Sequence, residues 1–146
     1  MSHTYHKIWL HYIWSTKTRA PLLTSQMRNK FINHVMEYAG QNEIDIDTLN
    51  ATADHVHLLS SLNPSQPPSK VINLIKGESS NWINKMNLTK GKFSWQEGYS
   101  VFSVSYSNVN RVRDYIKNQK EHHRKISFAE EIDKMLIAYK IGMETP

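Results

Sequence analysis

The 146-residue sequence contains no cysteine, which excludes disulfide bonds and thiolate metal ligands. Any metal site must therefore use histidine, carboxylate, amide or water ligands. The sequence also has no long hydrophobic run: residues 1–7 are polar, and the apolar segment after them is too short and too interrupted for a signal peptide or a membrane span. We expect a soluble, cytoplasmic protein. Its hydrophobic content of 39% is sufficient for a single compact core.

The charge is basic and unevenly distributed. The whole chain carries +5, while residues 1–126 carry +7 and residues 127–146 carry −2. A basic body with a mildly acidic tail favours a polyanionic partner, most often a nucleic acid. An incidental excess of basic residues on an ordinary soluble protein explains the charge equally well.

The order of the expected elements indicates an α+β fold. Composition or alternation typical of strands occurs at residues 5–15, 44–47, 54–62 and 99–106. Helical spacing of apolar residues predicts four helices: one that begins at a Ser25 cap, one over 71–86, one that begins at a Ser107 cap and a last one over 128–139. The resulting β-α-β-β-α-β order predicts a ferredoxin-like antiparallel sheet with helices on one face, plus C-terminal helices.

Two histidines stand one residue apart in the third expected strand. Side chains two apart on a strand project to the same side, so His55 and His57 can address one ion while Val56 points the other way. The pattern is weak by itself. Two partly exposed histidines at a sheet edge would look the same in the sequence.

A second polar pair lies on the third expected helix. Tyr115 and Gln119 are four residues apart and share a helix face, beside an apolar stripe and on the same flank as His122. An edge of this kind can border an active site. An ordinary surface tyrosine and glutamine on an amphipathic helix remains the alternative.

Together the motifs resemble the single-tyrosine, IS200-like transposases of the HUH endonuclease superfamily, which small insertion sequences encode. The resemblance covers most of the chain and rests on these segments: Trp14-Ser15-Thr16-Lys17-Thr18-Arg19, Asp54-His55-Val56-His57-Leu58-Leu59, Leu74-Ile75-Lys76-Gly77, Trp95-Gln96-Glu97-Gly98-Tyr99, Phe102-Ser103-Val104-Ser105, Tyr115-Ile116-Lys117-Asn118-Gln119 and Glu121-His122-His123-Arg124.

The resemblance implies a homodimer that cuts and rejoins single-stranded DNA at hairpin-bearing element ends, through a covalent 5′-phosphotyrosine intermediate. It implies that Tyr115 is the nucleophile and that His55, His57 and Gln119 hold Mg²⁺ or Mn²⁺. In some members the tyrosine helix serves the histidines of the partner subunit, and the sequence leaves this open. Residues 1–126 would form the catalytic domain, with 127–146 as an appended C-terminal helix of the same domain.

The implied chemistry is reasonable for these residue types. Two imidazoles and an amide are neutral, so they leave the full charge of a divalent ion available to stabilise a phosphoryl transition state. A phenol with a pKa near 10 needs help to lose its proton. Metal-bound water, His122 or the phosphate itself are candidate helpers, and Asp54 is expected in a turn or behind a metal ligand rather than in the chemistry.

Candidate DNA contacts are Lys17 and Arg19 after the first strand, and Lys90 and Lys92 before Trp95. Trp95 can stack on an unpaired base, although tryptophan beside a strand more often packs in a core.

Two other functions remain open. One is a catalytically inactive ferredoxin-like protein that binds single-stranded nucleic acid, such as a domesticated regulator; the other is a replication initiator or relaxase, which the small size disfavours.

Overall fold

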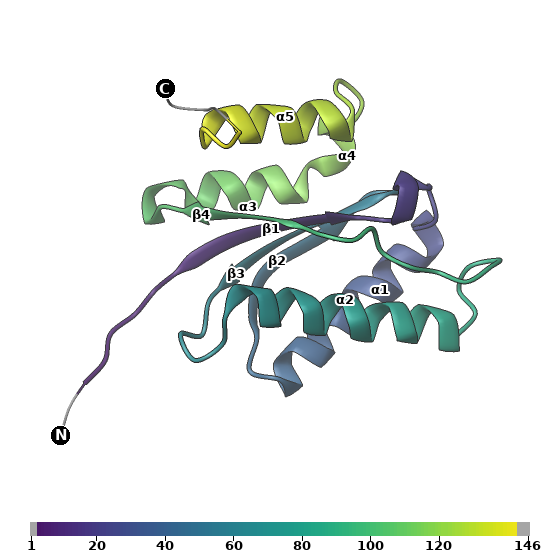
Figure 1. Cartoon of the computed structure of the whole chain (residues 1–146), viewed down its shortest axis with the longest axis horizontal. Helices are drawn as coiled ribbons and strands as arrows, with labels where there is room; N and C mark the ends of the chain where they lie inside the picture. Colours follow the sequence, from purple (N-terminus) through teal and green to yellow (C-terminus); the bar gives the residue numbers. More distant parts are fainter. Residues whose placement is uncertain (1–2, 143–146) are drawn as a thin grey trace.

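The computed structural model describes residues 3–142 (Figure 1). The elements follow one another as β1 (Trp9–Ser15), the 3-10 helix η1 (Lys17–Arg19), α1 (Ser25–Gln41), β2 (Asp45–Ala51), β3 (His55–Ser61), α2 (Pro68–Lys85), β4 (Ser100–Val104), the 3-10 helix η2 (Tyr106–Asn108), α3 (Val109–Lys117), α4 (Gln119–His122) and α5 (Phe128–Ala138). No helix within residues 3–142 has the length and apolar character needed to cross a membrane.

The four strands form one antiparallel sheet in the order β2-β3-β1-β4. Helices α1 and α2 cover one face, and α3, α4 and α5 lie on the other (Figure 1). This arrangement confirms the predicted ferredoxin-like α+β fold with additional C-terminal helices. The two strands that will matter most for the site, β1 and β3, are the central pair.

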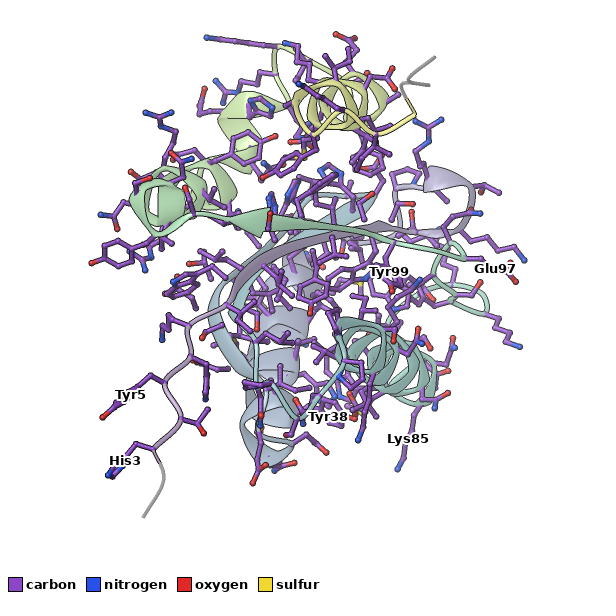
Figure 2. All side chains as sticks on the ribbon, turned by 60° about the vertical axis from the view of Figure 1, so that its left-hand side comes forward. His3, Tyr5, Tyr38, Lys85, Glu97 and Tyr99 are labelled. Atoms are coloured by element: carbon purple, nitrogen blue, oxygen red, sulfur yellow. The ribbon has the colours of Figure 1, made fainter. Side chains whose placement is uncertain are left out.

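The main core lies between the sheet and the first two helices. Alternate side chains of the central strands, including Trp14 of β1 and Leu58 of β3, pack there against Phe31 of α1 and Ile75 of α2. Side chains fill the space between these layers in Figure 2. Each fully buried side chain of this kind contributes about 1.5–3 kcal/mol, so this core holds the sheet in place.

The opposite sheet face carries a smaller apolar cluster formed by Leu59, Val104, Val109 and Ile116. Helix α3 is fixed over β2 by polar contacts as well. Arg113 donates two hydrogen bonds of 2.8 Å to the carboxylate of Asp47, and Asn50 Nδ2 donates to the Ile116 carbonyl at 2.8 Å. The helix that carries Tyr115 is therefore attached to the sheet on both sides of that residue.

Several element boundaries differ from the sequence predictions. Thr24, not Ser25, caps α1, because its Oγ1 accepts a hydrogen bond from the Met27 amide at 3.4 Å. The first strand begins at Trp9 rather than at residue 5, and the segment that carries His3 and Tyr5 extends away from the body of the protein (Figure 2).

The predicted third helix is also interrupted. Instead of starting at a Ser107 cap, α3 follows η2, and Asn108 makes no side-chain capping bond. The helix ends at Lys117, and the backbone angles of the next residue, Asn118 (φ −100°, ψ 25°), depart from the helical range. Tyr115 and Gln119 consequently belong to two successive helices, α3 and α4.

Candidate active site

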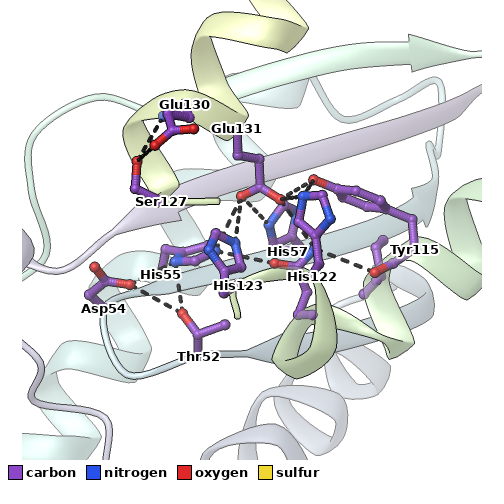
Figure 3. A network of polar contacts seen from close by, with 12 residues as sticks. Thr52, Asp54, His55, His57, Tyr115, His122, His123, Ser127, Glu130 and Glu131 are labelled. Carbon is purple, nitrogen blue, oxygen red and sulfur yellow. Dashed lines mark hydrogen bonds and ion pairs between the residues drawn. The ribbon is translucent and has the colours of Figure 1, made fainter. Parts of the chain in front are cut away.

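His55 and His57 project from β3 toward the helices α3 to α5, while Val56 lies in the main core on the other side (Figure 3). The alternation predicted from the sequence is confirmed. The two histidines are 1% and 0% exposed, so the alternative of partly exposed edge residues is wrong. Strand β3 is an inner strand, and Glu131 of α5 reaches over both imidazoles.

A partner holds the outer ring nitrogen of each histidine. Nδ1 of His55 lies 2.7 Å from Asp54 Oδ1 and 2.7 Å from Thr52 Oγ1, and Nδ1 of His57 lies 2.8 Å from Nε2 of His11 on β1. Such contacts fix the orientation of an imidazole and direct its second nitrogen to a ligand. Both Nε2 atoms therefore face the same point, and Asp54 contacts His55 from behind, as expected.

Tyr115 and Gln119 approach these histidines from the helical layer. The rings of Tyr115 and His57 are 5.7 Å apart between centroids, and Gln119 Oε1 lies 3.3 Å from Nε2 of His55. The amide nitrogen of Gln119 faces the Tyr115 carbonyl at 3.4 Å. The structure thus brings together the four residues that the sequence singled out, and all four come from one chain.

Glu131 of α5, which the sequence analysis missed, lies at the centre of the group (Figure 3). Its Oε1 is 3.2 Å from Nε2 of His57 and 3.3 Å from Nε2 of His55. Its Oε2 accepts hydrogen bonds from the Tyr115 hydroxyl and, at 3.3 Å, from the Gln119 amide nitrogen. The carboxylate therefore bridges the histidine pair and the tyrosine.

The sequence did contain a signal for Glu131. The inner face of α5 carries Phe128, Met135 and Ala138, at the spacing of an apolar stripe, and Glu131 falls within that stripe. A carboxylate on the buried face of an amphipathic helix needs polar partners. These partners come from β3 and α3, which the sequence alone does not bring near α5.

Two further histidines complete the cluster: His122 is the last residue of α4, and His123 follows it directly. Nε2 of His123 lies 3.1 Å from Glu131 Oε1, and Nε2 of His122 lies 3.1 Å from the Tyr115 hydroxyl and 3.4 Å from Glu131 Oε2. The break at Asn118 allows both side chains to turn toward the sheet. His122 has the contact with Tyr115 that a proton acceptor requires.

The electrostatics of the site centre on Glu131. Burial opposes its ionisation, but the contacts with His55, His57 and Tyr115 outweigh burial and hold the pKa of Glu131 well below its usual range. The same carboxylate acts on the phenol in the opposite direction. Burial and then the neighbouring Glu131 raise the pKa of Tyr115 far above its ordinary value, so the resting phenol is protonated.

The buried histidines differ from one another. Burial lowers the pKa of His57 to about 4 and that of His11 to about 3, so both rings are neutral near pH 7. Burial acts in the same direction on His55, but its contacts with Asp54 and Glu131 outweigh it and raise the pKa of His55. The site therefore combines an ionised Glu131 and a neutral His57 with a His55 that holds its proton more firmly, so a metal that binds His55 has to displace that proton.

A divalent metal ion fits this cluster. One ligand atom from each of His55, His57, His123 and Glu131 lies within 4.8 Å of the other three, close enough for ligation of one ion at about 2.0–2.2 Å after a small inward movement. The Gln119 amide oxygen, which the sequence proposed as a ligand, lies at the border of this group.

The basic residues after β1 lie near the site. The backbone amide of Thr16, immediately before Lys17, donates to the Asp54 carbonyl at 2.9 Å, so η1 begins beside His55. Lys17 and Arg19 are exposed, and a surface pocket connects Arg19 with the first turn of α5. Both predicted DNA contacts therefore lie at the end of the sheet that carries His55.

The other predicted DNA contacts lie farther away. Lys90 and Lys92 are exposed on the loop after α2, on the side of the sheet opposite the histidines (Figure 1). The base-stacking prediction for Trp95 is not supported, because this residue is only 8% exposed. Its ring packs against Trp14, Phe31 and Phe93. Its Nε1 donates to Ser79 Oγ at 3.0 Å, so Trp95 is a core residue.

A ferredoxin-like sheet that presents a His-x-His pair to a helix-borne tyrosine defines the class of tyrosine transposases that the sequence motifs resemble. The model of the family "Transposase IS200 like" matches residues 4–119, and the chain belongs to this family of DNA-cleaving and DNA-transferring enzymes.

Individual relatives agree with this assignment. The chain is 28% identical over 115 residues to the ISDra2 transposase TnpA of Deinococcus radiodurans. The aligned region covers 75% of this chain and 81% of the relative. It is 25% identical over 129 residues to the transposase of the insertion sequence IS200 of Salmonella typhimurium, covering 85% and 84% of the two chains.

Two solved structures share the fold. A candidate transposase from Deinococcus radiodurans R1 superimposes with a TM-score of 0.66 at 26% identity, over 82% of this chain and 95% of the other. A REP-associated tyrosine transposase bound to a REP hairpin superimposes with a TM-score of 0.60 at 17% identity, over 84% and 74%.

Proposed function

We propose that this transposase cuts and rejoins single-stranded DNA through a covalent 5′-phosphotyrosine intermediate at Tyr115, with the help of a divalent metal ion. One observation carries the proposal: the phenol of Tyr115 and the Nε2 atoms of His55 and His57 contact opposite oxygens of the same buried carboxylate. A nucleophile and a candidate metal site that share one carboxylate can act on the same phosphate.

In this proposal His55 and His57 hold Mg²⁺ or Mn²⁺, with Gln119 beside them. The bound ion supplies electrostatic stabilisation for the negative charge that develops on the phosphate oxygens. The orientation of the ligands and the transfer of the phenolic proton depend on side chains of the protein. Asp54 and His11 hold the outer nitrogens of the two histidine rings and so keep both Nε2 atoms directed inward.

Tyr115 would attack the phosphorus, so that a bond forms between its oxygen and the 5′ phosphate while the bond from phosphorus to the 3′ oxygen breaks. The phenolic proton has an acceptor in place, because Nε2 of His122 contacts the hydroxyl, while Glu131, whose pKa is held low, orients the phenol. The departing strand leaves with a 3′ hydroxyl. The tyrosine ester conserves the energy of the phosphodiester, and another 3′ hydroxyl can later attack it, so rejoining needs no nucleotide cofactor.

A largely apolar pocket of about 300 Å³ beside Tyr115 supports an approach path for the strand. It lies between α3 and α5, and Arg111 and Lys134 stand at its border. Together with Lys17 and Arg19 these residues supply positive charge around the proposed phosphate position, while Lys90 and Lys92 would contact a flanking part of the hairpin.

The family resemblance also suggests a homodimer and single-stranded hairpin ends as the substrate. The solved relative with a bound REP hairpin supports the DNA partner. Since Tyr115 and both histidines meet within one chain, we propose that the histidines use the tyrosine of their own subunit. Sedimentation of the protein with and without hairpin DNA tests the dimer.

The decisive experiment is an adduct assay. The full-length protein is incubated with labelled single-stranded hairpin DNA and Mn²⁺, and a covalent protein-DNA species is sought on a denaturing gel. Tyr115→Phe should abolish the adduct and leave binding nearly unchanged. Tyr106→Phe, which alters an 85% exposed tyrosine shortly before α3, is the matched control and should retain the adduct.

Two results would contradict the proposal. An adduct that persists in Tyr115→Phe would show that another residue is the nucleophile. A wild-type protein that binds the hairpin but never forms an adduct would instead favour the catalytically inactive nucleic-acid-binding protein.

A further inference from the structure

We infer that Glu131 of α5 is a metal ligand, so that His55, His57, His123 and Glu131 form the metal site while Gln119 orients the carboxylate. The inference deepens the proposed function and rests on its metal requirement. It differs from the ligand set that the sequence suggests, because it replaces a neutral amide with an anionic oxygen from the C-terminal helix.

The surroundings of Glu131 fit those of a metal ligand. The residue is only 2% exposed, and among residues 3–142 no lysine or arginine pairs with it. Its Oε1 instead faces the Nε2 atoms of three imidazoles at 3.1–3.3 Å. A buried carboxylate surrounded by ring nitrogens is a combination of ligands that first-row divalent metals bind well.

The outer contacts of the histidines point to the same conclusion. The groups behind His55 and His57 occupy their Nδ1 atoms, and this leaves Nε2 of each ring directed at Glu131. Ligating histidines in proteins are held in this way by a carboxylate or another polar group on the second nitrogen. Three Nε2 atoms and one carboxylate oxygen thus converge, and the rings of His55 and His57 are already held in orientation.

Gln119 is better placed to hold Glu131 than to replace it. Its amide nitrogen donates to Oε2 of Glu131 at 3.3 Å, and Oε2 also accepts from the Tyr115 hydroxyl. Oε1 remains free to face the three imidazoles. One oxygen of Glu131 would therefore serve the metal and the other would hold the nucleophile, which makes α5 a working part of the active site.

The ligand set has a consequence for the choice of metal. Imidazole-rich sites with one carboxylate favour Mn²⁺ and later first-row ions over Mg²⁺, which prefers oxygen ligands and water. A carboxylate also increases retention of the ion relative to an all-neutral site. We therefore expect Mn²⁺ to bind the DNA-free protein more tightly than Mg²⁺.

The test is a titration of the DNA-free, full-length protein with Mn²⁺, in which electron paramagnetic resonance measures the unbound ion. Glu131→Gln keeps the shape and size of the side chain and should weaken Mn²⁺ binding by at least about 10- to 100-fold. Glu130→Gln is the matched control, because Glu130 is the exposed neighbour on the same helix and its carboxylate accepts a hydrogen bond from Ser127 rather than from the cluster. The Mn²⁺ affinity of this variant should equal that of the wild type. Gln119→Ala should weaken binding less than Glu131→Gln does.

Other outcomes would overturn the inference. Unchanged affinity in Glu131→Gln would mean that the carboxylate is not a ligand. Tighter Mn²⁺ binding would mean that Glu131 forms an ion pair with the histidines that the metal must displace. A larger loss in Gln119→Ala than in Glu131→Gln would restore the amide as the third ligand.

A second variant and the adduct assay distinguish loss of the ligand from loss of folding and from failure of the proposed function. If Glu131→Gln does not fold, Glu131→Asp retains the charge at a shorter reach and should bind Mn²⁺ more weakly than the wild type; wild-type affinity would count against ligation. The adduct assay is independent of this titration. Mn²⁺ binding through Glu131 without any adduct would contradict the proposed function alone, and an adduct with normal Mn²⁺ binding in Glu131→Gln would contradict this inference alone.

Discussion

Nε2 of His11 on β1 lies 2.8 Å from Nδ1 of His57 on β3, and both rings are buried. If His57 is to offer Nε2 to a metal, its Nδ1 must carry the proton and donate to His11, which must then accept through a neutral Nε2. Burial holds the pKa of His11 at about 3, which satisfies this requirement. His11 is therefore a positioning residue for His57.

We predict that His11→Leu lowers Mn²⁺ affinity and the rate of adduct formation about 10- to 100-fold, because His57 loses the acceptor on its outer nitrogen. His11→Gln should recover part of the loss, since its amide oxygen can accept the same hydrogen bond. His34→Leu, which removes a histidine on the other side of the sheet, is the control. Equal losses in the leucine and glutamine variants would argue against the acceptor role.

The metal-facing histidines lead to a second prediction. His55→Ala and His57→Ala should each reduce adduct formation to background, as the sequence already suggests. The structure adds a loss of stability, because both side chains are buried and each removal leaves Glu131 with fewer partners. We expect a decrease of about 2–4 kcal/mol in the free energy of unfolding by urea denaturation. Loss of stability with full cleavage would refute the ligand assignment.

The sequence predicted the parts of the site that depend on local geometry. Two-residue alternation is sufficient to place His55 and His57 on one face, and the four-residue spacing is sufficient to bring Tyr115 near Gln119. Glu131 depends on a different kind of information. It lies on a helix that the sequence describes as appended, and only the packing of α5 over the sheet brings its carboxylate to β3.

The same distinction explains the differences in the fold. Ferredoxin-like order follows from the succession of strands and helices, which local patterns reveal. The break at Asn118 has no glycine or proline to announce it, so periodicity alone extends α3 through Gln119. For Trp95, the sequence favours core packing but is also compatible with base stacking. The contacts with Trp14 and Phe31 decide between them.

Trp95 supports a third prediction, on stability. Trp95→Ala should lower the free energy of unfolding by about 3–5 kcal/mol, because it leaves a cavity among three aromatic neighbours. Trp95→Phe should cost less and leave hairpin binding unchanged, as measured by fluorescence anisotropy. A stable Trp95→Phe protein with greatly weakened DNA binding would reinstate a base-stacking role.

The basic residues of η1 give a fourth prediction. A Lys17→Gln/Arg19→Gln double variant should weaken hairpin binding, and the slope of log affinity against log salt should fall by about 0.7 for each lost phosphate contact on a single strand. Lys30→Gln/Lys85→Gln removes the same charge from the outer faces of α1 and α2 and is the matched control. Equal changes in both double variants would indicate net charge rather than local contact.

The ion pair between Asp47 and Arg113 gives a fifth prediction, on pH. Hydrogen bonds from Arg113 hold the pKa of Asp47 below its ordinary value of 3.8. A depressed carboxyl pKa adds stability that is present above about pH 4 and is lost as the pH falls through the lowered value. Because the pair is partly exposed, screening by solvent keeps its contribution small.

Asp47→Asn should therefore be less stable than the wild type at pH 7, and the two melting temperatures should converge as the pH falls through the lowered pKa of Asp47. Asp45→Asn alters an exposed carboxylate on the same strand that makes no ion pair in the described chain, so it should show no such convergence. Since Arg113 lies on the helix that carries Tyr115, adduct formation should also slow in Asp47→Asn. A difference in melting temperature between Asp47→Asn and the wild type that stays constant across this pH range would show that the ion pair does not fasten α3 to β2.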